Sequence, residues 1–394
     1  MTIYKPRVLL EAVGSAPDRV CSIGAFVRQE YQAFRRQGHK VGLLEPGSTD
    51  YTSAPIQAHS SERVFSDDAV THVLIHTPSI ADRARPWSVL VNALKLKKRF
   101  KNARHIQVVH EYTEAPHHWR LRQRMLLGLA DGFIVNTKQE YEALSALSDR
   151  PCLYTKLGPT IYSHEWLDAA NKPVPPGGAS VTSSNLEATV IKALAATRHC
   201  LTEKYEIDFS KPTYVYQGLI TPGKGIELIL ELSKTLPVDS QWILIGGQGI
   251  RRKDANYASH ILAEGRRILG GRFHYYENLP DEIYQQFLLA AHVLVLLYDN
   301  GVSERRSSFL SSAASGGHIL TTLGPYSAAM NLEHSGAVTA EIGHFAALKS
   351  QLANMGTDSE VVAVARRVKN LQWASNQSWP MRVQAITRFL DTNF

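Results

Sequence analysis

Cysteine and long hydrophobic runs are what this sequence most clearly lacks. Its 394 residues include only Cys21, Cys152 and Cys200, which are far apart and show no Cys-x-x-Cys or Cys/His ligand spacing. This usage predicts neither a disulfide framework nor a zinc site, and free buried thiols are the simpler interpretation. No apolar run is long enough for a transmembrane helix, and the first residues read as a strand and not as a signal peptide. We therefore expect a cytoplasmic globular protein.

Acidic residues are missing from one segment of a basic chain, whose formal charge is +7. Between Asp82 and Glu111 there is no acid, whereas the bases are Arg83, Arg85, Lys95, Lys97, Lys98, Arg99, Lys101 and Arg104, followed later by Arg120, Arg122 and Arg124. Apolar residues lie among them, so the segment from Arg83 to Arg104 could bind an anionic membrane surface, an acidic acceptor or a nucleic acid, or be a solvated helix face. Few aromatic residues are interleaved, so we expect no nucleic-acid partner.

The order of apolar segments predicts two α/β halves. In the first half, strands expected at Arg7–Val13, Val41–Leu44, Val70–His76, Ile106–His110, Gly132–Asn136 and Tyr154–Leu157 alternate with helices. A stretch rich in Pro, Gly and Ser from Asn171 predicts a linker, and a second series begins near Thr213. We predict domains over 1–185 and 186–375, and a C-terminal helix over 376–394 that packs back on the first domain. Two doubly wound parallel sheets facing each other form a central cleft, where ligands usually bind.

The stretch from Tyr298 to Thr322 carries the clearest chemical signal. The apolar run Val293–Leu297 ends at the turn signal Asp299-Asn300-Gly301, which predicts a buried strand. A helix capped by Ser303 should follow and stop at Gly316-Gly317. Amides at its start would form an anion site, suited to a diphosphate, together with Ser303, Arg305, Arg306, Ser307 and Ser308. The alternative is a solvated helix start whose arginines pair with surface acids.

Motifs over most of the chain resemble those of one family, in the same order. In the first half, QGHKVGLLE resembles the family's helix ending in a GHxV strand, VVHEY its VxHD-like strand end, and LADGFIVNTKQEYEAL its ADxVIxxS unit. In the second half, YQGLITPGKGIELIL resembles GRLxxxKGxxxLL, WILIGGQG resembles LxIxGxG, and YYENLPDEIYQQFLLAAHVLVLL resembles FxGxVxxxELxxLYxxADVxVxPS. The family is that of the retaining, family-4-type glycosyltransferases of the GT-B fold. The resemblance implies two facing Rossmann-like domains.

The resemblance also implies an activity: transfer of a hexosyl group from a nucleotide diphosphate sugar, expected as a UDP-sugar, to a glycan precursor or lipid-linked acceptor. Retained anomeric configuration is implied, with neither metal nor cofactor, and the lack of an Asp-x-Asp triplet agrees with a diphosphate neutralised by side chains and helix dipoles. Lys224 would stabilise the leaving diphosphate, and His110 would hydrogen-bond the donor sugar or shape the reacting face. Other implied donor contacts are Gly14, Ser15, Gly218, Gly223, Tyr276, Asn278 and Leu279.

Plain structural interpretations remain open for these residues. Lys224 could be a surface lysine after a Pro-Gly turn, and His110 could satisfy backbone groups at a strand end. The segment Tyr276–Leu279 could be an ordinary turn between a strand and a helix.

The chain departs from the family pattern in its charged residues. Leu219 follows Gly218 where the family has an arginine, so Arg305 or Arg306 is the candidate for that charge. The family's two glutamates in EGFGxxxxEAxAxGxPVV fall on serines, which are Ser303 and Ser311, and Glu304 lies one residue from the first. Either Glu304 takes the first catalytic role, or Ser303 and the backbone hold the sugar.

These departures keep a second function open, a non-catalytic GT-B module that binds a nucleotide sugar or a partner protein. An epimerase is disfavoured because no acid/base cluster surrounds Arg28. For the transferase, the basic segment predicts a cytoplasmic protein that can bind at the inner face of a membrane.

Overall fold

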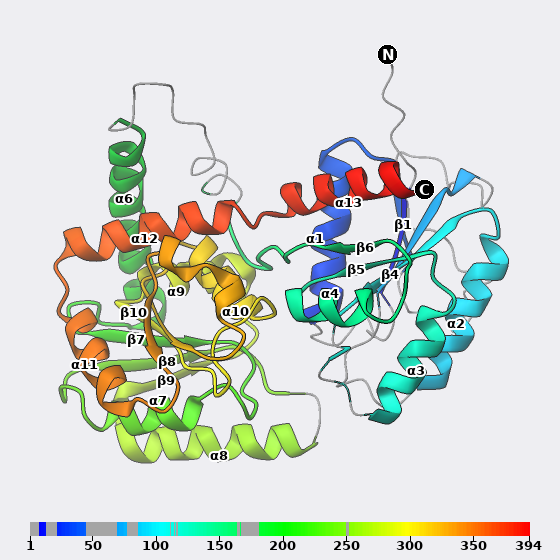
Figure 1. Ribbon diagram of the computed structural model, residues 1–394. Coiled ribbons are helices and arrows are strands. Elements are labelled where there is room, and N and C mark those ends of the chain that lie inside the picture. The colour runs from blue at the N-terminus through cyan, green and yellow to red at the C-terminus, as the bar shows by residue number, and fades with distance from the viewer. Residues whose placement is uncertain are drawn as a thin grey trace. The chain divides into compact units, whose positions relative to one another are not determined.

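The computed structural model describes residues 8–12, 22–44, 69–76, 86–110, 112–113, 115, 117–163, 166, 181–249 and 252–394. Its internal contacts divide the chain into two compact units (Figure 1). Unit 1 comprises Met1–Gly158 and Ser378–Phe394, and unit 2 comprises Pro159–Gln377. The end of the chain therefore belongs to the unit in which the chain begins.

Unit 1 is built on a parallel sheet. Within its described residues, six strands pair in the order β2-β1-β3-β4-β5-β6, and they are β1 (Val8–Ala12), β2 (Val41–Leu44), β3 (His72–His76), β4 (Arg104–Val109), β5 (Gly132–Val135) and β6 (Cys152–Tyr154). The strand predicted to begin at Tyr154 instead ends there. This edge strand is only half-buried, so its apolar pattern is weak in the sequence.

The helices of unit 1 are α1 (Ser22–Arg36), α2 (Pro86–Arg99), α3 (His117–Leu127), α4 (Lys138–Ser145) and α13 (Trp379–Asn393). Leu96 of α2 and Leu126 of α3 join Val73 and Ile75 of β3 in one apolar core. Helix α4 begins where the Thr137 hydroxyl accepts the amide of Glu140 at 3.2 Å, an N-cap. Helix α13 packs against α1.

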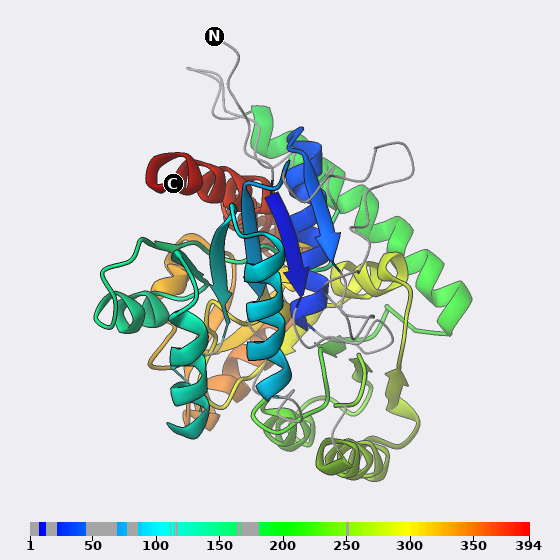
Figure 2. The same ribbon diagram turned by 90° about the vertical axis from the view of Figure 1, so that its right-hand side faces the viewer.

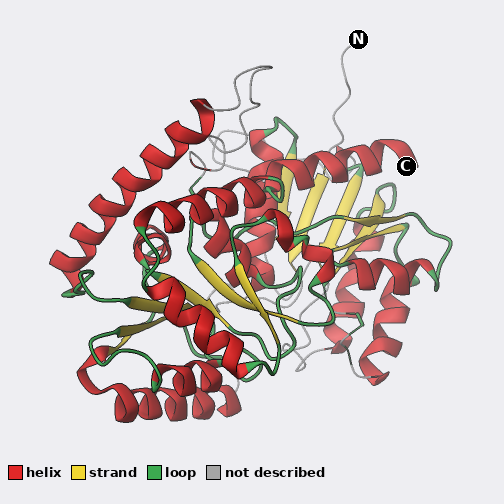
Figure 3. Ribbon diagram, turned by 60° about the vertical axis from the view of Figure 1, so that its left-hand side comes forward, coloured by secondary structure: helices red, strands yellow, loops and turns green. Residues whose placement is uncertain are grey.

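Unit 2 has a second parallel sheet, with helices on both of its faces (Figure 3). Within the described residues its strands pair in the order β12-β11-β10-β7-β8-β9, and they are β7 (Thr213–Gln217), β8 (Gln241–Ile245), β9 (Phe273–Tyr276), β10 (Val293–Leu296), β11 (Ile319–Leu323) and β12 (Val338–Glu341). All of the pairings are parallel. Its four central strands are apolar because both faces are covered.

The helices of unit 2 are α6 (Val181–Tyr205), α7 (Ile226–Ser233), α8 (Arg252–Leu269), α9 (Asp281–Ala290), α10 (Ser307–Ala314), α11 (Phe345–Gly356) and α12 (Glu360–Ser375), with short 3₁₀ turns η3 (Gly270–Arg272), η4 (Ala328–Met330) and η5 (Leu332–His334). Within the described residues, no helix has both the length and the apolar character needed to cross a membrane. The sequence placed the domain boundary at 185–186, whereas the contacts place it after Gly158. The reason is local: Thr160 hydrogen-bonds to Ser311 of α10, and Trp166 packs on the core between α6 and α12.

A buried arginine joins three helices of unit 2. Arg367 of α12 donates from Nη1 to the carbonyl oxygens of Leu289 at 2.7 Å and Gly316 at 2.9 Å, and from Nη2 to the carbonyl of Ala291. These carbonyls lie at the ends of α9 and α10, where the helix dipoles favour a cation. Burial, and to a lesser extent the nearby Arg198, lowers the pKa of Arg367 to about 9. The guanidinium therefore stays charged at neutral pH.

Candidate functional site

The carboxyl edge of the unit 2 sheet brings two predicted loops together. Because β7 and β10 are neighbours in a parallel sheet, the loops that follow them lie at the same edge. The loop after β7 carries Lys224 and leads into α7, and the loop after β10 carries Tyr298 and Arg306 and leads into α10. The amino ends of two helices are thus directed to this edge, as an anion site requires.

Two cations share one aromatic ring at this edge. The Lys224 Nζ lies 5.7 Å from the ring centroid of Tyr298, and the Arg306 Cζ lies 4.7 Å from the same centroid. Tyr298 itself is buried, and its hydroxyl is 2.6 Å from the Oγ of Ser308. The structure therefore brings Lys224, Arg306 and Ser308 of the predicted site together around Tyr298, which the sequence did not single out.

The charges at this edge are only partly balanced. Burial, and secondly Arg306, lowers the pKa of Lys224 to about 7. Burial, followed by Glu227, raises the pKa of Asp299, while Arg306 acts in the opposite direction. Among the described residues neither Lys224 nor Arg306 forms an ion pair with an acid, and the buried Nε of Arg306 has no hydrogen-bond partner there. A bound anion would supply the missing partner.

Two glycines allow this edge to form. Gly225 precedes α7 at φ 65°, and a Cβ there would lie 1.5 Å from the carbonyl oxygen of Leu297. Gly246 follows β8 at φ 138°, and a Cβ there would lie 2.1 Å from the carbonyl oxygen of Gly218. Only glycine fits such contacts and such φ values without strain. The loop that carries Lys224 is thereby held against the end of β10.

Helix α10 begins later than predicted, so the prediction that Ser303 caps it is wrong. The carbonyl of Ser303 accepts the amide of Arg306 at 2.9 Å, which closes a turn. Arg306 is the residue before the helix, its ψ of 79° is not helical, and its side chain makes no capping bond. Ser307 and Ser308 therefore occupy the first turn of α10.

The two positions that correspond to the family's glutamates have different surroundings. Glu304 is only 4% exposed, whereas Ser303 and Arg305 are half-buried. Ser311, at the second position, accepts hydrogen bonds from the amides of Thr160 and Ile161, each at 3.2 Å. Its hydroxyl is thus engaged with the segment after Pro159.

A buried glutamine, missed by the sequence reading, fixes the start of α10. Gln217, the last residue of β7, donates from Nε2 to the carbonyl of Ser308 and to the Oγ of Ser312 at 3.1 Å. Its Oε1 accepts the hydroxyl of Tyr284 on α9 at 2.8 Å. The sequence did contain a signal for Gln217, because it is a polar residue at the end of an apolar strand, directly before Gly218.

The loop after β9 contains the predicted Tyr276, Asn278 and Leu279. The Tyr276 hydroxyl donates to the carbonyl of Tyr205 at 3.3 Å, and its ring lies 5.2 Å from the rings of Tyr205 and Phe287. This tyrosine is therefore packed among α6 and α9. Asn278 has φ 55°, so the loop turns sharply before α9.

In unit 1, His110 follows β4 and is buried. Its Nε2 lies 3.1 Å from Nδ1 of His76, and its Nδ1 lies 3.0 Å from Nδ2 of Asn136. Because Nδ2 of Asn136 also donates to the carbonyl of Val109 at 3.3 Å, the amide nitrogen faces the ring. Nδ1 of His110 is then an acceptor and Nε2–H donates to His76. Both ring nitrogens have protein partners, and a sugar hydroxyl would have to replace one of them.

This interaction continues into what we term the histidine chain, formed by His110, His76, Glu30 and Arg382. Nε2 of His76 lies 3.7 Å from Oε1 of Glu30, and Oε2 of Glu30 accepts Nε of Arg382 at 2.6 Å. Burial, and secondly Arg382, lowers the pKa of His76 to about 3, so its ring is neutral. His76 ends β3 as His110 follows β4, so the strand-end rule that selected His110 could also have found His76.

Some predicted residues lie outside the described part of the chain, namely Gly14, Ser15, Arg83 and Arg85. Gly218 and Gly223 are described, with φ of 130° and 85°, on the loop that carries Lys224.

No family model matches the chain, and no curated protein matches its sequence. Solved structures match over nearly its whole length. The chain is similar to sucrose-phosphate synthase from Thermosynechococcus elongatus, at 14% identity and TM-score 0.66, covering 98% of this chain and 99% of that one. It is similar to Anabaena HepE in complex with UDP and glucose, at 13% identity and TM-score 0.63, covering 99% and 100%. It is also similar to trehalose-6-phosphate synthase OtsA, at 12% identity and TM-score 0.64, covering 98% and 99%.

These similarities show the fold. The chain has the GT-B fold, with two α/β units each built on a parallel sheet, and this confirms the fold class that the sequence motifs predicted. A fold hosts many functions, so the activity has to be argued from the site.

Proposed function

We propose that this chain is a retaining glycosyltransferase that moves a hexosyl group from a nucleotide diphosphate sugar to an acceptor hydroxyl. The observation that carries the proposal is the approach of Lys224 and Arg306 to Tyr298, at the amino ends of α7 and α10. A diphosphate would bind between these groups as the missing counter-ion. We expect UDP as the nucleotide, because HepE, which shares the fold, is seen with UDP and with UDP-glucose.

The proposed chemistry needs charge stabilisation at the leaving group. The bond between the anomeric carbon and the phosphate oxygen breaks, and the acceptor oxygen bonds to that carbon on the same face. The acceptor's hydroxyl proton passes to the leaving phosphate. Lys224 and Arg306 would stabilise the negative charge that develops on the diphosphate, so no metal or cofactor enters the proposal. Arg306, not Arg305, is our candidate for the arginine that the family has after its glycine.

His110 and Glu304 have narrower proposed roles. Since both ring nitrogens of His110 are engaged, we assign it the shaping of the reacting face through a fixed ring orientation. Glu304, which is only 4% exposed, is proposed to contact a hydroxyl of the donor sugar, and Ser303 is the alternative. Gly14, Ser15, Gly218, Gly223, Tyr276, Asn278, Leu279, Ser307 and Ser308 remain proposed donor contacts. The acceptor would be a glycan precursor or a lipid-linked sugar.

The test compares donor binding and turnover in matched variants. UDP and UDP-sugars should raise the melting temperature of the wild type, because they bind only the folded state. Lys224→Ala should lower turnover by about 100- to 1000-fold, and Arg306→Ala by a similar factor, as for other lost charge-stabilising donors. Lys234→Ala, at the other end of α7, is the control and should have no effect. Unchanged turnover in Lys224→Ala would overturn the assignment.

A second function, a non-catalytic module that binds a nucleotide sugar, is favoured by one observation. Ser311 stands where the family has a carboxylate, and its hydroxyl is already engaged with two backbone amides. Such a module would be stabilised by the donor but would release no free nucleotide, with or without acceptors. Nucleotide release from the donor therefore separates the two functions.

A further inference from the structure

Helices α2 and α3 of unit 1 lie side by side on the outside of the sheet and contain no acid (Figures 1 and 2). Their inner sides are accounted for, because Ala93 and Leu96 of α2 and Leu126 of α3 belong to one apolar core. The question is what their outer sides contact.

The outer sides carry exposed aliphatic residues. On α2, Val91 and Leu94 are 47% and 48% exposed, and on α3, Leu121 and Met125 are 63% and 48% exposed. Residues three or four apart lie on the same side of a helix, so each pair forms a stripe. We call these four residues the α2–α3 face. Exposed apolar side chains gathered in this way mark an interaction surface.

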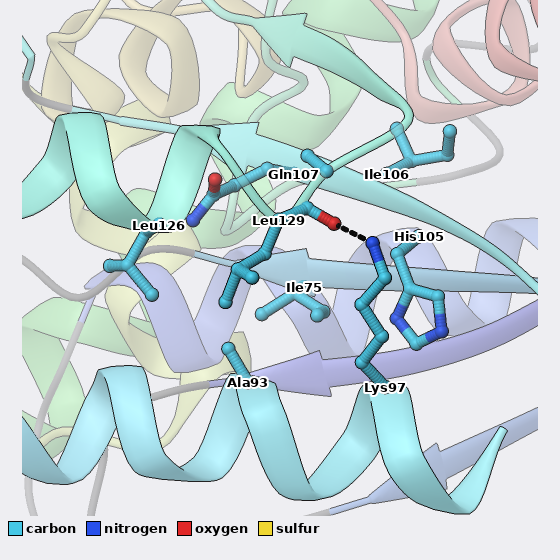
Figure 4. Close-up of a pocket in the computed structure, with 9 residues that line it drawn as sticks. Ile75, Ala93, Lys97, His105, Ile106, Gln107, Leu126 and Leu129 are labelled. Atoms are coloured by element: carbon cyan, nitrogen blue, oxygen red, sulfur yellow. Dashed lines mark hydrogen bonds between the residues drawn. The ribbon is translucent and has the colours of Figure 1, made fainter. Parts of the chain in front are cut away.

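Basic residues accompany this face. Lys98 of α2, four residues after Leu94, and Arg124 of α3, three residues after Leu121, are exposed, and so is Lys101 just beyond the end of α2. Lys97 is not one of them: its Nζ donates to the carbonyl of Leu129 at 2.6 Å, across a small hollow beneath the two helices (Figure 4). Lys98 and Arg124 therefore place positive charge on the same sides of α2 and α3 as the exposed aliphatic residues.

We propose that the α2–α3 face binds the headgroup region of an anionic membrane, with its aliphatic residues entering the bilayer interface. Lysine and arginine are attracted to anionic headgroups, and aliphatic side chains gain by leaving water for the acyl boundary. A nucleic acid would instead call for aromatic stacking partners, and the exposed apolar residues here are aliphatic. Positive charge together with exposed aliphatic residues matches the anionic headgroups and the acyl boundary of a membrane.

The experiment is flotation with vesicles, which needs no substrate and so stands or falls separately from the proposed transferase activity. The wild type should float with phosphatidylcholine vesicles containing about 30% phosphatidylglycerol and not with phosphatidylcholine alone. The apolar variant Leu94→Ser, Leu121→Ser, Met125→Ser should bind at least about tenfold more weakly, since its anchors are lost. The charge variant Lys98→Glu, Lys101→Glu should lose a similar factor.

Matched controls come from exposed residues of unit 2. Val238→Ser with Val361→Ser, and Arg266→Glu with Lys349→Glu, should leave flotation unchanged. The proposal is overturned if the wild type does not float with anionic vesicles, or if the apolar variant floats as well as the wild type. It is also overturned if sedimentation shows a wild-type dimer that the apolar variant abolishes, because the face would then be covered by a second copy.

Discussion

The carboxyl edges of the two sheets differ in whether their buried cations have an acidic partner. In unit 1, the buried carboxylate of Glu30 forms an ion pair with the buried guanidinium of Arg382, and His76 shares a hydrogen bond with His110. In unit 2, Lys224 and Arg306 approach the same ring without an acid partner among the described residues. A buried charge that has a counter-charge costs the fold much less than a buried charge that has none, and a cation without an acid gains its partner when an anion binds. The first edge supplies its own counter-charge, and the second has the properties of an anion site.

The largest effect is expected where the buried ion pair of unit 1 is broken. Arg382→Met leaves the buried carboxylate of Glu30 without its cation, which should lower the free energy of unfolding by about 3–5 kcal/mol. Urea denaturation measures this loss. The double variant Glu30→Leu, Arg382→Met removes both charges and should recover most of the stability. A single variant that loses less than about 1 kcal/mol would show that the pair does not hold α13 to α1.

A smaller loss of stability is expected at Gln217, which positions the start of α10 in unit 2. Gln217→Leu leaves the carbonyl of Ser308 and the hydroxyls of Ser312 and Tyr284 without this partner. The free energy of unfolding should therefore fall by about 1–3 kcal/mol. Donor affinity should also fall, because the start of α10 is no longer fixed. Gln351→Leu removes one hydrogen bond on β12 and is the control. Equal losses in the two variants would contradict the special role of Gln217.

The pH dependence of donor binding tests the charge of Lys224. With a pKa of about 7, Lys224 is mostly protonated below that pH and mostly neutral above it. A diphosphate binds the protonated form, so affinity for UDP-glucose should fall about tenfold between about pH 6 and pH 8, with proton uptake at the higher pH. Calorimetry in two buffers measures both. Lys224→Gln should bind weakly with no such dependence; a dependence that persists would assign the titration elsewhere.

The stability of the free protein tests the same charge without a donor. A lysine whose pKa is lowered on folding destabilises the folded state fully below about pH 7, and this penalty is relieved as pH rises toward the unfolded pKa. Lys224→Met should therefore raise the free energy of unfolding below about pH 7, and by less near about pH 10. Thermal unfolding at both pH values measures it, with Lys234→Met as the control. A gain that grows with pH would have the wrong sign.

Local signals were enough to predict much of the fold and part of the site. Alternating strands and helices gave both parallel sheets, because each element carries its own apolar period. Lys224 was found because the segment YQGLITPGKGIELIL resembles a motif of the glycosyltransferase family, and Arg306 because it lies near a helix start. The start of α10 was misplaced because Ser303 fits a cap in isolation, whereas the folded chain uses its carbonyl in a turn.

The remaining features depend on distant residues, which no local pattern links. Glu30 and Arg382 are separated by 352 positions, and Gln217 meets Ser312 across 95. The sequence suggested no role for Tyr298, which follows the apolar run Val293–Leu297, although both cations approach its ring. Such contacts are set by the packing of the sheets and helices and not by spacing in the sequence.

The return of the chain to unit 1 at Ser378 makes the folding of unit 1 depend on residues that are translated after the whole of unit 2. Unit 2 is contiguous in sequence, so none of its own contacts spans the other unit. Unit 1 needs Ser378–Phe394, because Arg382 is the cation for Glu30 and α13 packs against α1. The unit whose first residues are translated earlier is thus completed by the segment that is translated later.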